Sequence, residues 1–194
     1  MITIGILGDI GSGKSFVAKS FGYPVFHADE HVKKIYHKNK YCYKKLKKKL
    51  PKYIKSFPVD KIELLKAVIS NKKNLKIISN IVHPLVRKEM SLFFKKNKKR
   101  KIVVLDIPLL IENKLNKKKD ILVFVNAKKT EIYKRLKRRK NYNKKILEIM
   151  KDLQIDSKTK KSISNYVINN NYNPKTVKNA INSIKNDIFK LWMK

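Results

Sequence analysis

Gly8-Asp9-Ile10-Gly11-Ser12-Gly13-Lys14-Ser15 follows the pattern G-x-x-x-x-G-K-S, which is typical of a phosphate-binding loop, or P-loop. The apolar, β-branched residues 1–7 before it predict a buried strand, and the helical spacing of residues 15–21 after it predicts a helix. Glycines let such a loop turn with positive φ and bring its N–H groups against phosphate oxygens, next to the positive end of the helix. This order of elements predicts a nucleotide-binding α/β fold.

The last residues of the motif carry side chains with expected roles in ATP binding. Lys14 is expected to reach the β- and γ-phosphates, and the Ser15 hydroxyl is expected to hold Mg²⁺. The other expected ATP contacts of this segment are Gly11, Ser12, Gly13 and Phe16. The alternative is a glycine-rich turn that matches the pattern by chance, and the strand before and the helix after the loop disfavour it.

Composition limits the class of protein. With 194 residues and 42% hydrophobic content, the chain can bury one sizeable core. A single cysteine, Cys42, cannot form an internal disulfide, and no apolar run approaches the length of a membrane span. The short apolar start has no basic segment before it and leads directly into the P-loop, so it is not expected to be a signal peptide. We therefore expect a soluble cytoplasmic protein without a membrane partner.

The net charge of +35 would ordinarily suggest a nucleic-acid partner. The lysines, however, recur along nearly the whole chain among many asparagines, as a coding bias would produce, so we expect no specific nucleic-acid partner. A nucleic-acid-binding module with an incidental P-loop remains the alternative from a different class. Because few of the 49 basic residues are arginines, an arginine marks a candidate for bidentate phosphate binding. The arginines are Arg87, Arg100, Arg135, Arg138 and Arg139.

Apolar runs alternate with helical stretches, which predicts a parallel sheet in an α/β fold. The expected strands after the P-loop helix are residues 23–29, 101–107, 120–126 and 166–170, with 101–107 and 120–126 adjacent in the core. Residues 30–98 are expected to be mostly helical, and further helices are expected over about 128–140 and on to about 153. A closing helix begins after Asn173-Pro174, and its apolar face comprises Val177, Ile181, Ile184, Ile188 and Leu191.

Two acidic residues stand where predicted strands end, which is the edge where α/β sheets bind ligands. Asp106 is placed like an acid that orients Mg²⁺, and a solvated strand-end carboxylate is its alternative. Asp29 could accept the proton of an acceptor hydroxyl during phosphoryl transfer, and its alternative is an N-cap for a helix that starts at Glu30.

Several motifs resemble those of the dephospho-CoA kinase family. His27-Ala28-Asp29 followed by Lys33 is similar to D-A-D-x-x-x-R, His83-Pro84-Leu85-Val86-Arg87 to H-P-x-V-R, and Pro108-Leu109-Leu110-Ile111-Glu112 to P-L-L-x-E. The resemblance continues with Arg135-Leu136-Lys137-Arg138-Arg139, which is similar to R-L-x-x-R of the lid. Gln154 and Lys160 stand at the family's Q-x-x-x-x-x-K spacing, and Tyr166-Val167-Ile168-Asn169-Asn170 is similar to the family's D-Y-V-I-D-N. The match runs in order from residue 2 to about residue 171.

This resemblance implies transfer of the ATP γ-phosphate to the ribose 3′-hydroxyl of dephospho-CoA, the last step of coenzyme A biosynthesis. In this family Asp29 would be the base, and Lys33, His83 and Arg87 would bind the acceptor. Glu112, with Pro108 and Leu109, would shape the pocket beside it. Arg135 and Arg139 would clamp ATP phosphates from one face of a lid helix, with Arg139 neutralising transition-state charge.

The implied architecture is a P-loop kinase, a three-layer α/β/α fold over residues 1–194 as one domain. It would carry a helical acceptor-binding insertion over about 30–98 and a helical lid over about 128–160. Each motif residue has a structural alternative. His83-Pro84 could start a helix, Glu112 could pair with a lysine, and the two lid arginines could form a solvated face.

The chain also departs from the family pattern. His27 and Lys33 replace an aspartate and an arginine, and a lone histidine at a strand end is more often structural than a metal ligand. Asp9 stands where the family usually has glycine, and its carboxylate could repel phosphate unless it turned away. Ile132 and Tyr172 occupy positions that are often glutamine and glycine.

Two other enzyme classes share the P-loop. A nucleoside or nucleotide kinase is the main rival, because it shares the loop and the arginine lid. A regulatory GTPase is disfavoured because its D-x-x-G switch needs a later glycine, and no glycine follows Gly22. The N-K-x-D base-reading motif is missing as well, since Asn116 and Asp120 have the wrong spacing.

Overall fold

A computed structural model describes residues 1–139 and 142–192, and these divide between two compact units. The sheet unit comprises Met1–His27, Lys99–Tyr142 and Lys151–Lys194, and the helical unit comprises Ala28–Lys98 and Asn143–Met150. The P-loop belongs to the sheet unit, whereas Asp29 and Arg87 belong to the helical unit.

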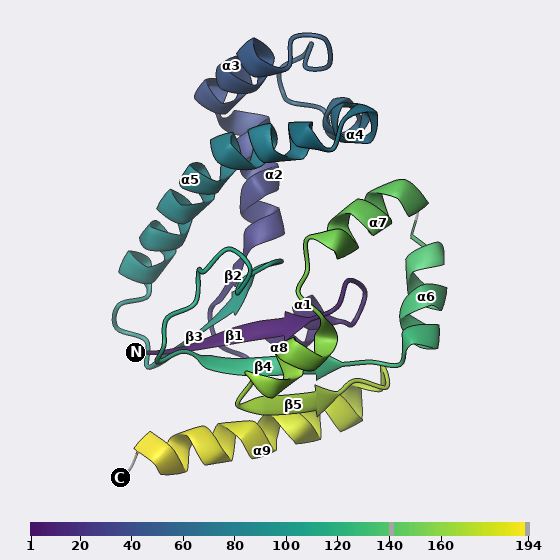
Figure 1. The fold of residues 1–194 in the computed structure, drawn as a ribbon. Coiled ribbons are helices and arrows are strands. Elements are labelled where there is room, and N and C mark those ends of the chain that lie inside the picture. Colours follow the sequence, from purple (N-terminus) through teal and green to yellow (C-terminus); the bar gives the residue numbers. More distant parts are fainter. Residues whose placement is uncertain (140–141, 193–194) are drawn as a thin grey trace. The chain divides into compact units, whose positions relative to one another are not determined.

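Five parallel strands form the sheet in the order β2-β3-β1-β4-β5 (Figure 1). They are β1 (Ile2–Gly8), β2 (Val25–His27), β3 (Ile102–Asp106), β4 (Ile121–Asn126) and β5 (Tyr166–Asn169). The expectation that the runs 101–107 and 120–126 are neighbours is wrong, because β1 lies between β3 and β4 and pairs with both. Both runs are almost uniformly apolar, so their pattern shows that they are buried but carries no information on their order.

One face of the sheet packs against α1 (Lys14–Ser20) and α9 (Pro174–Trp192) in a core that includes Ile4, Val17 and Ile181. The predicted start of α9 is confirmed, since the Asn173 side chain accepts a hydrogen bond from the Lys175 N–H at 2.9 Å. Its predicted apolar face is confirmed as far as Ile188. Leu191 is 66% exposed, so including it in that face was wrong; the helix extends beyond the core after Ile188.

On the opposite face, the chain after β3 packs directly onto the backbone of β1. A Cβ added at Gly5 would lie 2.6 Å from Leu110 Cδ2, so a side chain there would displace the Leu110 side chain. The short helix α8 (Ser157–Ser162) also packs against β1. At the end of β1, α6 (Lys129–Lys137) lies over Gly11, where an added Cβ would come within 3.2 Å of Ile132 and Leu136. The P-loop is therefore enclosed by elements from later in the chain.

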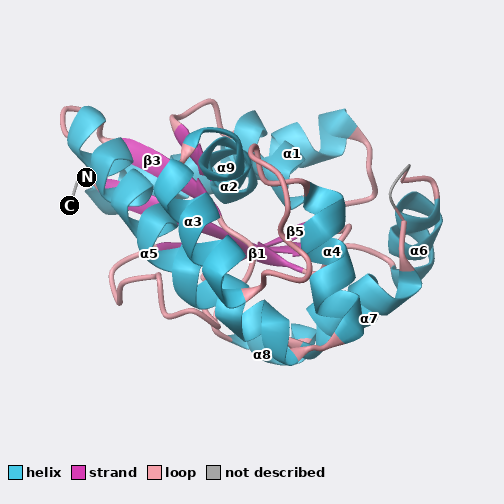
Figure 2. Ribbon diagram, turned by 90° about the horizontal axis from the view of Figure 1, so that it is seen from above, coloured by secondary structure: helices cyan, strands magenta, loops and turns pink. Residues whose placement is uncertain are grey.

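Helices and connecting loops make up the helical unit (Figure 2). Its helices α2 (Ala28–Lys38), α3 (Lys40–Lys49) and α4 (Lys61–Ser70) each pack against α5 (Lys73–Lys96), and α7 (Lys144–Asp152) contributes residues 144–150. Pro84 lies inside α5, so the alternative in which His83-Pro84 starts a helix is wrong. Among the described residues, none of the helices combines the length and apolar character needed to cross a membrane.

Candidate active site

The P-loop leaves β1 at Gly8 and enters α1 at Lys14, as the sequence predicts. Gly13 is the N-cap of α1 and has φ 95°, in the left-handed region that side chains rarely adopt. A Cβ at this position would also lie 2.3 Å from Asn170 Nδ2. Glycine at position 13 is therefore required both by the backbone conformation and by the close approach of Asn170.

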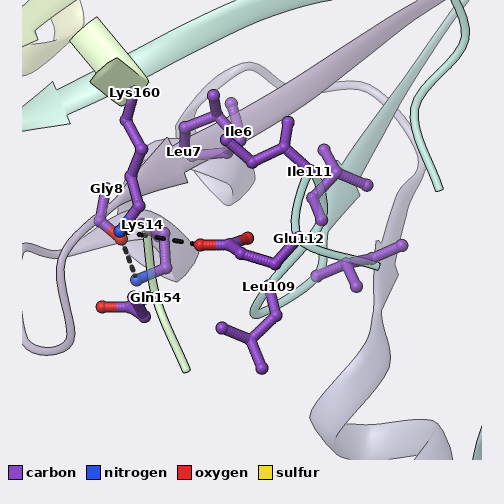
Figure 3. A pocket seen from close by; sticks show the side chains of 11 residues that line it. Ile6, Leu7, Gly8, Lys14, Leu109, Ile111, Glu112, Gln154 and Lys160 are labelled. Atoms are coloured by element: carbon purple, nitrogen blue, oxygen red, sulfur yellow. Dashed lines mark hydrogen bonds and ion pairs between the residues drawn. The ribbon is translucent and has the colours of Figure 1, made fainter. Parts of the chain in front are cut away.

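Lys14 folds back over the loop that contains it. Its Nζ donates hydrogen bonds to the carbonyl oxygens of Gly8 at 3.0 Å and Asp9 at 2.8 Å, and Figure 3 shows the first of them. Ser15 and Phe16 are exposed at the start of α1, whereas Ser12 is buried. The Ser15 hydroxyl is thus accessible, and any phosphate contact of Ser12 would come from its backbone.

The loop between β5 and α9 holds the other end of the P-loop. Asn170, only 4% exposed, donates from Nδ2 to the carbonyl of Ser12 at 2.8 Å and accepts the Tyr172 N–H at 2.9 Å. The Tyr172 hydroxyl donates to the carbonyl of Gly11 at 3.1 Å. Asn170 was part of the family resemblance, but its contact with the P-loop could not be read from the sequence.

Arg135 on α6 stacks its guanidinium over the Tyr172 ring, with 4.3 Å to the centroid. Burial raises the pKa of Tyr172, which keeps its phenol protonated as a donor. The expected pairing of Arg135 and Arg139 on one helix face is wrong, because α6 ends at Lys137 with Arg138 as its C-cap. Arg139 therefore lies in the turn that follows the helix, and Lys140, where the predicted helix ended, lies outside the described residues.

Asp106 is the last residue of β3 and is 7% exposed, so the alternative of a solvated carboxylate is wrong. Its Oδ2 lies 2.9 Å from Nδ1 of His27, its register partner on β2. The contact supports the structural interpretation of His27 over a role as a lone metal ligand. Among residues 1–139 and 142–192, no group of three or more histidine, cysteine or acidic side chains could hold a metal ion.

A small cavity lies beside the P-loop in the sheet unit (Figure 3). Its polar lining consists of Lys14, Glu112, Gln154 and Lys160, and Leu109 and Leu110 are among its apolar walls. Glu112 does pair with a lysine, since its Oε1 lies 3.9 Å from Lys160 Nζ. Pro108 begins the turn but does not line the cavity. The P-loop lysine and the glutamate of the P-L-L-x-E segment thus line one cavity.

The remaining predicted acceptor residues lie on α2 and α5 of the helical unit. The expected strand over residues 23–29 ends at His27, and Asp29 lies in the first turn of α2, which starts before the predicted Glu30. Lys33 follows Asp29 by one helical turn, as Arg87 follows His83 on α5. Burial, with a smaller contribution from Arg87, lowers the pKa of His83 and favours its neutral form.

Comparison with known proteins shows the family to which the chain belongs. The sequence profile of dephospho-CoA kinase matches residues 2–175, which include every predicted site residue. The chain belongs to the dephospho-CoA kinase family. The dephospho-CoA kinase of Wolbachia pipientis wMel is 33% identical over 186 residues, covering 93% of this chain and 95% of that protein.

Solved structures support the same fold. The crystal structure of TT1252 from Thermus thermophilus has a TM-score of 0.75 at 26% identity and covers 98% of this chain and 97% of that one. The dephospho-CoA kinase from Campylobacter jejuni has a TM-score of 0.63 at 22% identity, with 96% of each chain covered, and shows the fold alone. The predicted P-loop kinase fold and membership of the dephospho-CoA kinase family, whose members catalyse the last step of coenzyme A biosynthesis, are confirmed.

Proposed function

We propose that this dephospho-CoA kinase uses ATP and Mg²⁺ to phosphorylate the ribose 3′-hydroxyl of dephospho-CoA in the cytoplasm. The observation that carries the proposal is the shared cavity, in which Lys14 of the P-loop and Glu112 of the P-L-L-x-E segment line the same space. An element expected to bind the donor therefore meets one expected to shape the acceptor pocket. No specific nucleic-acid partner is part of the proposal, because the lysines are spread along the whole chain.

Lys14 binds the β- and γ-phosphates in this proposal, and the loop segment from Gly11 to Phe16 surrounds them. In the structure its ammonium is held by two backbone carbonyls, which are neutral acceptors. Charged phosphate oxygens are stronger acceptors for an ammonium, so nucleotide can replace the carbonyls. Arg135 and Arg139 supply further positive charge, with Arg139 neutralising charge that develops in the transition state.

The donor set at the strand ends fits Mg²⁺. Asp106 supplies a carboxylate at the end of β3, and Ser15 supplies an exposed hydroxyl at the start of α1. Both are the hard oxygen ligands that Mg²⁺ prefers, and Mg²⁺ usually keeps several waters besides one or two protein ligands. When bound, the ion neutralises charge on the β- and γ-phosphate oxygens. His27 orients the Asp106 carboxylate through its 2.9 Å contact.

Asp29 is proposed to accept the proton of the 3′-hydroxyl as the phosphoryl group is transferred. Lys33, His83 and Arg87 are assigned to acceptor binding, and Pro108, Leu109 and Glu112 to the shape of the pocket. A neutral His83, favoured by its lowered pKa, can donate one hydrogen bond and accept another.

Substrate choice is tested by coupled ADP release with dephospho-CoA, nucleosides and nucleoside monophosphates as acceptors. Turnover with dephospho-CoA alone supports the proposal, and turnover only with nucleosides or their monophosphates contradicts it. Asp29→Asn should lower kcat by roughly 10²–10⁴-fold, the range for a lost general base, and leave the Kd for ATP nearly unchanged. Glu30→Gln, at the exposed neighbouring acid, is the matched control. Equal turnover by Asp29→Asn and wild type would remove Asp29 from the mechanism.

A further inference from the structure

The carboxylate of Asp9, at the rim of the P-loop, is bound by a segment more than a hundred residues later in the chain. Ser157 Oγ lies 2.8 Å from Oδ1 and 2.6 Å from Oδ2 of Asp9, so the hydroxyl can donate its hydrogen bond to either carboxylate oxygen. Lys160 Nζ lies 3.5 Å from the same Oδ1. The Asp9 carboxylate, which could repel a phosphate, is thus paired with a hydroxyl and an ammonium.

Glu112 is bound by the same segment. The Ile155 N–H donates to Glu112 Oε1 at 3.2 Å, and Lys160 Nζ lies 3.9 Å from that oxygen. Figure 3 shows the ammonium of Lys160 reaching toward Glu112 and the end of β1. Residues 155–160 therefore contact one carboxylate on the P-loop and one on the turn after β3, and we call this segment the clip.

Lys160 is the residue of the clip whose side chain faces both carboxylates. Its side chain is 2% exposed, and those of Asp9 and Glu112 are 33% and 11% exposed. A buried ammonium needs charged partners, and two carboxylates that share one ammonium depend on each other through it. Removing Lys160 would leave two like charges near each other, whereas removing either acid leaves a balanced pair.

Asp9 also links the clip to Lys14. The backbone carbonyl of Asp9 accepts a hydrogen bond from Lys14, and its carboxylate is held by the clip. Any shift of Asp9 therefore moves an acceptor of the lysine assigned to the ATP phosphates. Glu112, the other carboxylate that the clip contacts, is assigned to the acceptor pocket.

We propose that Lys160 is a positioning residue that couples the P-loop to the Glu112 turn through Asp9 and Glu112. It fixes the donor-binding loop relative to the wall of the acceptor pocket without binding either substrate. The Glu112 side of this inference rests on the proposed function. The same arrangement accounts for Asp9 in a loop where a free carboxylate would oppose phosphate binding.

A double-mutant cycle tests the coupling. Asp9→Asn and Glu112→Gln are measured singly and together, first in the wild-type background and then with Lys160→Met, using the Kd for ATP and kcat and KM for dephospho-CoA. In the wild-type background the combined effect should differ from the product of the single effects by about threefold or more. With Lys160→Met this departure should become smaller, because only the direct repulsion between the two carboxylates then links their effects. Ser157→Ala removes the other partner of Asp9 and keeps Lys160, so the cycle should still show the coupling in this variant even if Lys160→Met fails to fold.

Lys161→Met is the matched control, because Lys161 is the exposed neighbour of Lys160 and should leave every constant unchanged. Multiplicative single effects in the wild-type background overturn the proposal. Tighter ATP binding by Asp9→Asn also overturns it, since the carboxylate would then act only as a repelling charge. Absence of dephospho-CoA turnover by the wild-type protein would contradict the proposed function alone, because the cycle in the Kd for ATP still tests the coupling.

Discussion

The two ends of the P-loop are held in different ways. At the first end, charged and hydroxyl side chains of residues 155–160 bind the Asp9 carboxylate. At the second end, Asn170 and Tyr172 bind backbone carbonyls, and α6 packs apolar side chains on Gly11. The first end depends on the side chain at position 9 as well as on the glycine at position 8, whereas the second depends on the glycines at positions 11 and 13. Sequence variation is therefore easier to accommodate at position 9 than at the glycines.

A common feature links both ends. The carbonyl oxygens of Gly8, Asp9, Gly11 and Ser12 each accept a hydrogen bond from a side chain. Carbonyl oxygens carry partial negative charge and would oppose a phosphate. Asn170 and Tyr172, which engage the carbonyls of Ser12 and Gly11, thereby favour a loop conformation that offers N–H groups to an anion.

The largest effect is expected where backbone and neighbour both require glycine. Gly13→Ala adds a Cβ 2.3 Å from Asn170 Nδ2 at a φ of 95°. The left-handed backbone strain alone costs about 1–3 kcal/mol and the close contact with Asn170 adds to it, so the Kd for ATP, measured by titration calorimetry, should rise by about tenfold or more. Gly22→Ala is the control, because Gly22 also has positive φ but only Lys185 Nζ, at 3.9 Å, near the added atom. Equal ATP binding by Gly13→Ala and wild type would refute the close-approach argument.

A smaller effect is expected from the amide that supports the loop. Asn170→Ala leaves the Ser12 carbonyl without its donor, and an unpaired buried acceptor costs about 1–3 kcal/mol. Urea denaturation should show a loss of this size in the free energy of unfolding, and ATP binding should weaken as well. Asn169→Ala is the control, since the Asn169 side chain is exposed and accepts a hydrogen bond from Asn126 instead of supporting the P-loop. Matching losses in the two variants would count against a specific role for Asn170.

The smallest effect is expected from a single hydroxyl at the same end. Tyr172→Phe removes the donor to the Gly11 carbonyl but keeps the ring under Arg135. One such hydrogen bond contributes about 0.5–1.5 kcal/mol, so ATP affinity should fall by about two- to tenfold. The measurement is again calorimetric, with Tyr133→Phe on the exposed face of α6 as control. An unchanged affinity would assign the support of this end to Asn170 and the apolar contacts.

The sequence was most informative where local chemistry determines structure. The P-loop pattern specified a strand, a turn and a helix, and Asn173-Pro174 specified the start of α9, because these signals act over a few neighbouring residues. Strand order was not specified, since β3 before Asp106 and the buried part of β4 are both apolar. The end of α6 before Arg139 was also missed, as lysine and arginine are good helix formers and give no stop signal.

Site contacts over long sequence separations were the hardest to predict. Asp9 was recognised as a departure from the family pattern and Lys160 as part of a family motif. Nothing in their spacing predicted a contact between residues separated by 151 positions. The contact exists because α8 packs against β1 near the P-loop, which is a property of the folded chain. The roles assigned to Asp29 and Arg87 still rest on the family motifs and stay predictions.

The burial of Lys160 also makes its reactivity a measure of local opening. In a chain with 49 basic residues, most lysines are open to amine-reactive reagents, whereas Lys160 is 2% exposed. Its rate of acylation, followed by peptide mass spectrometry, would therefore report how often the segment around it opens. Nucleotide that stabilises the contacts of Lys160 with Asp9 and Glu112 should slow labelling at this amine and leave exposed Lys161 unaffected.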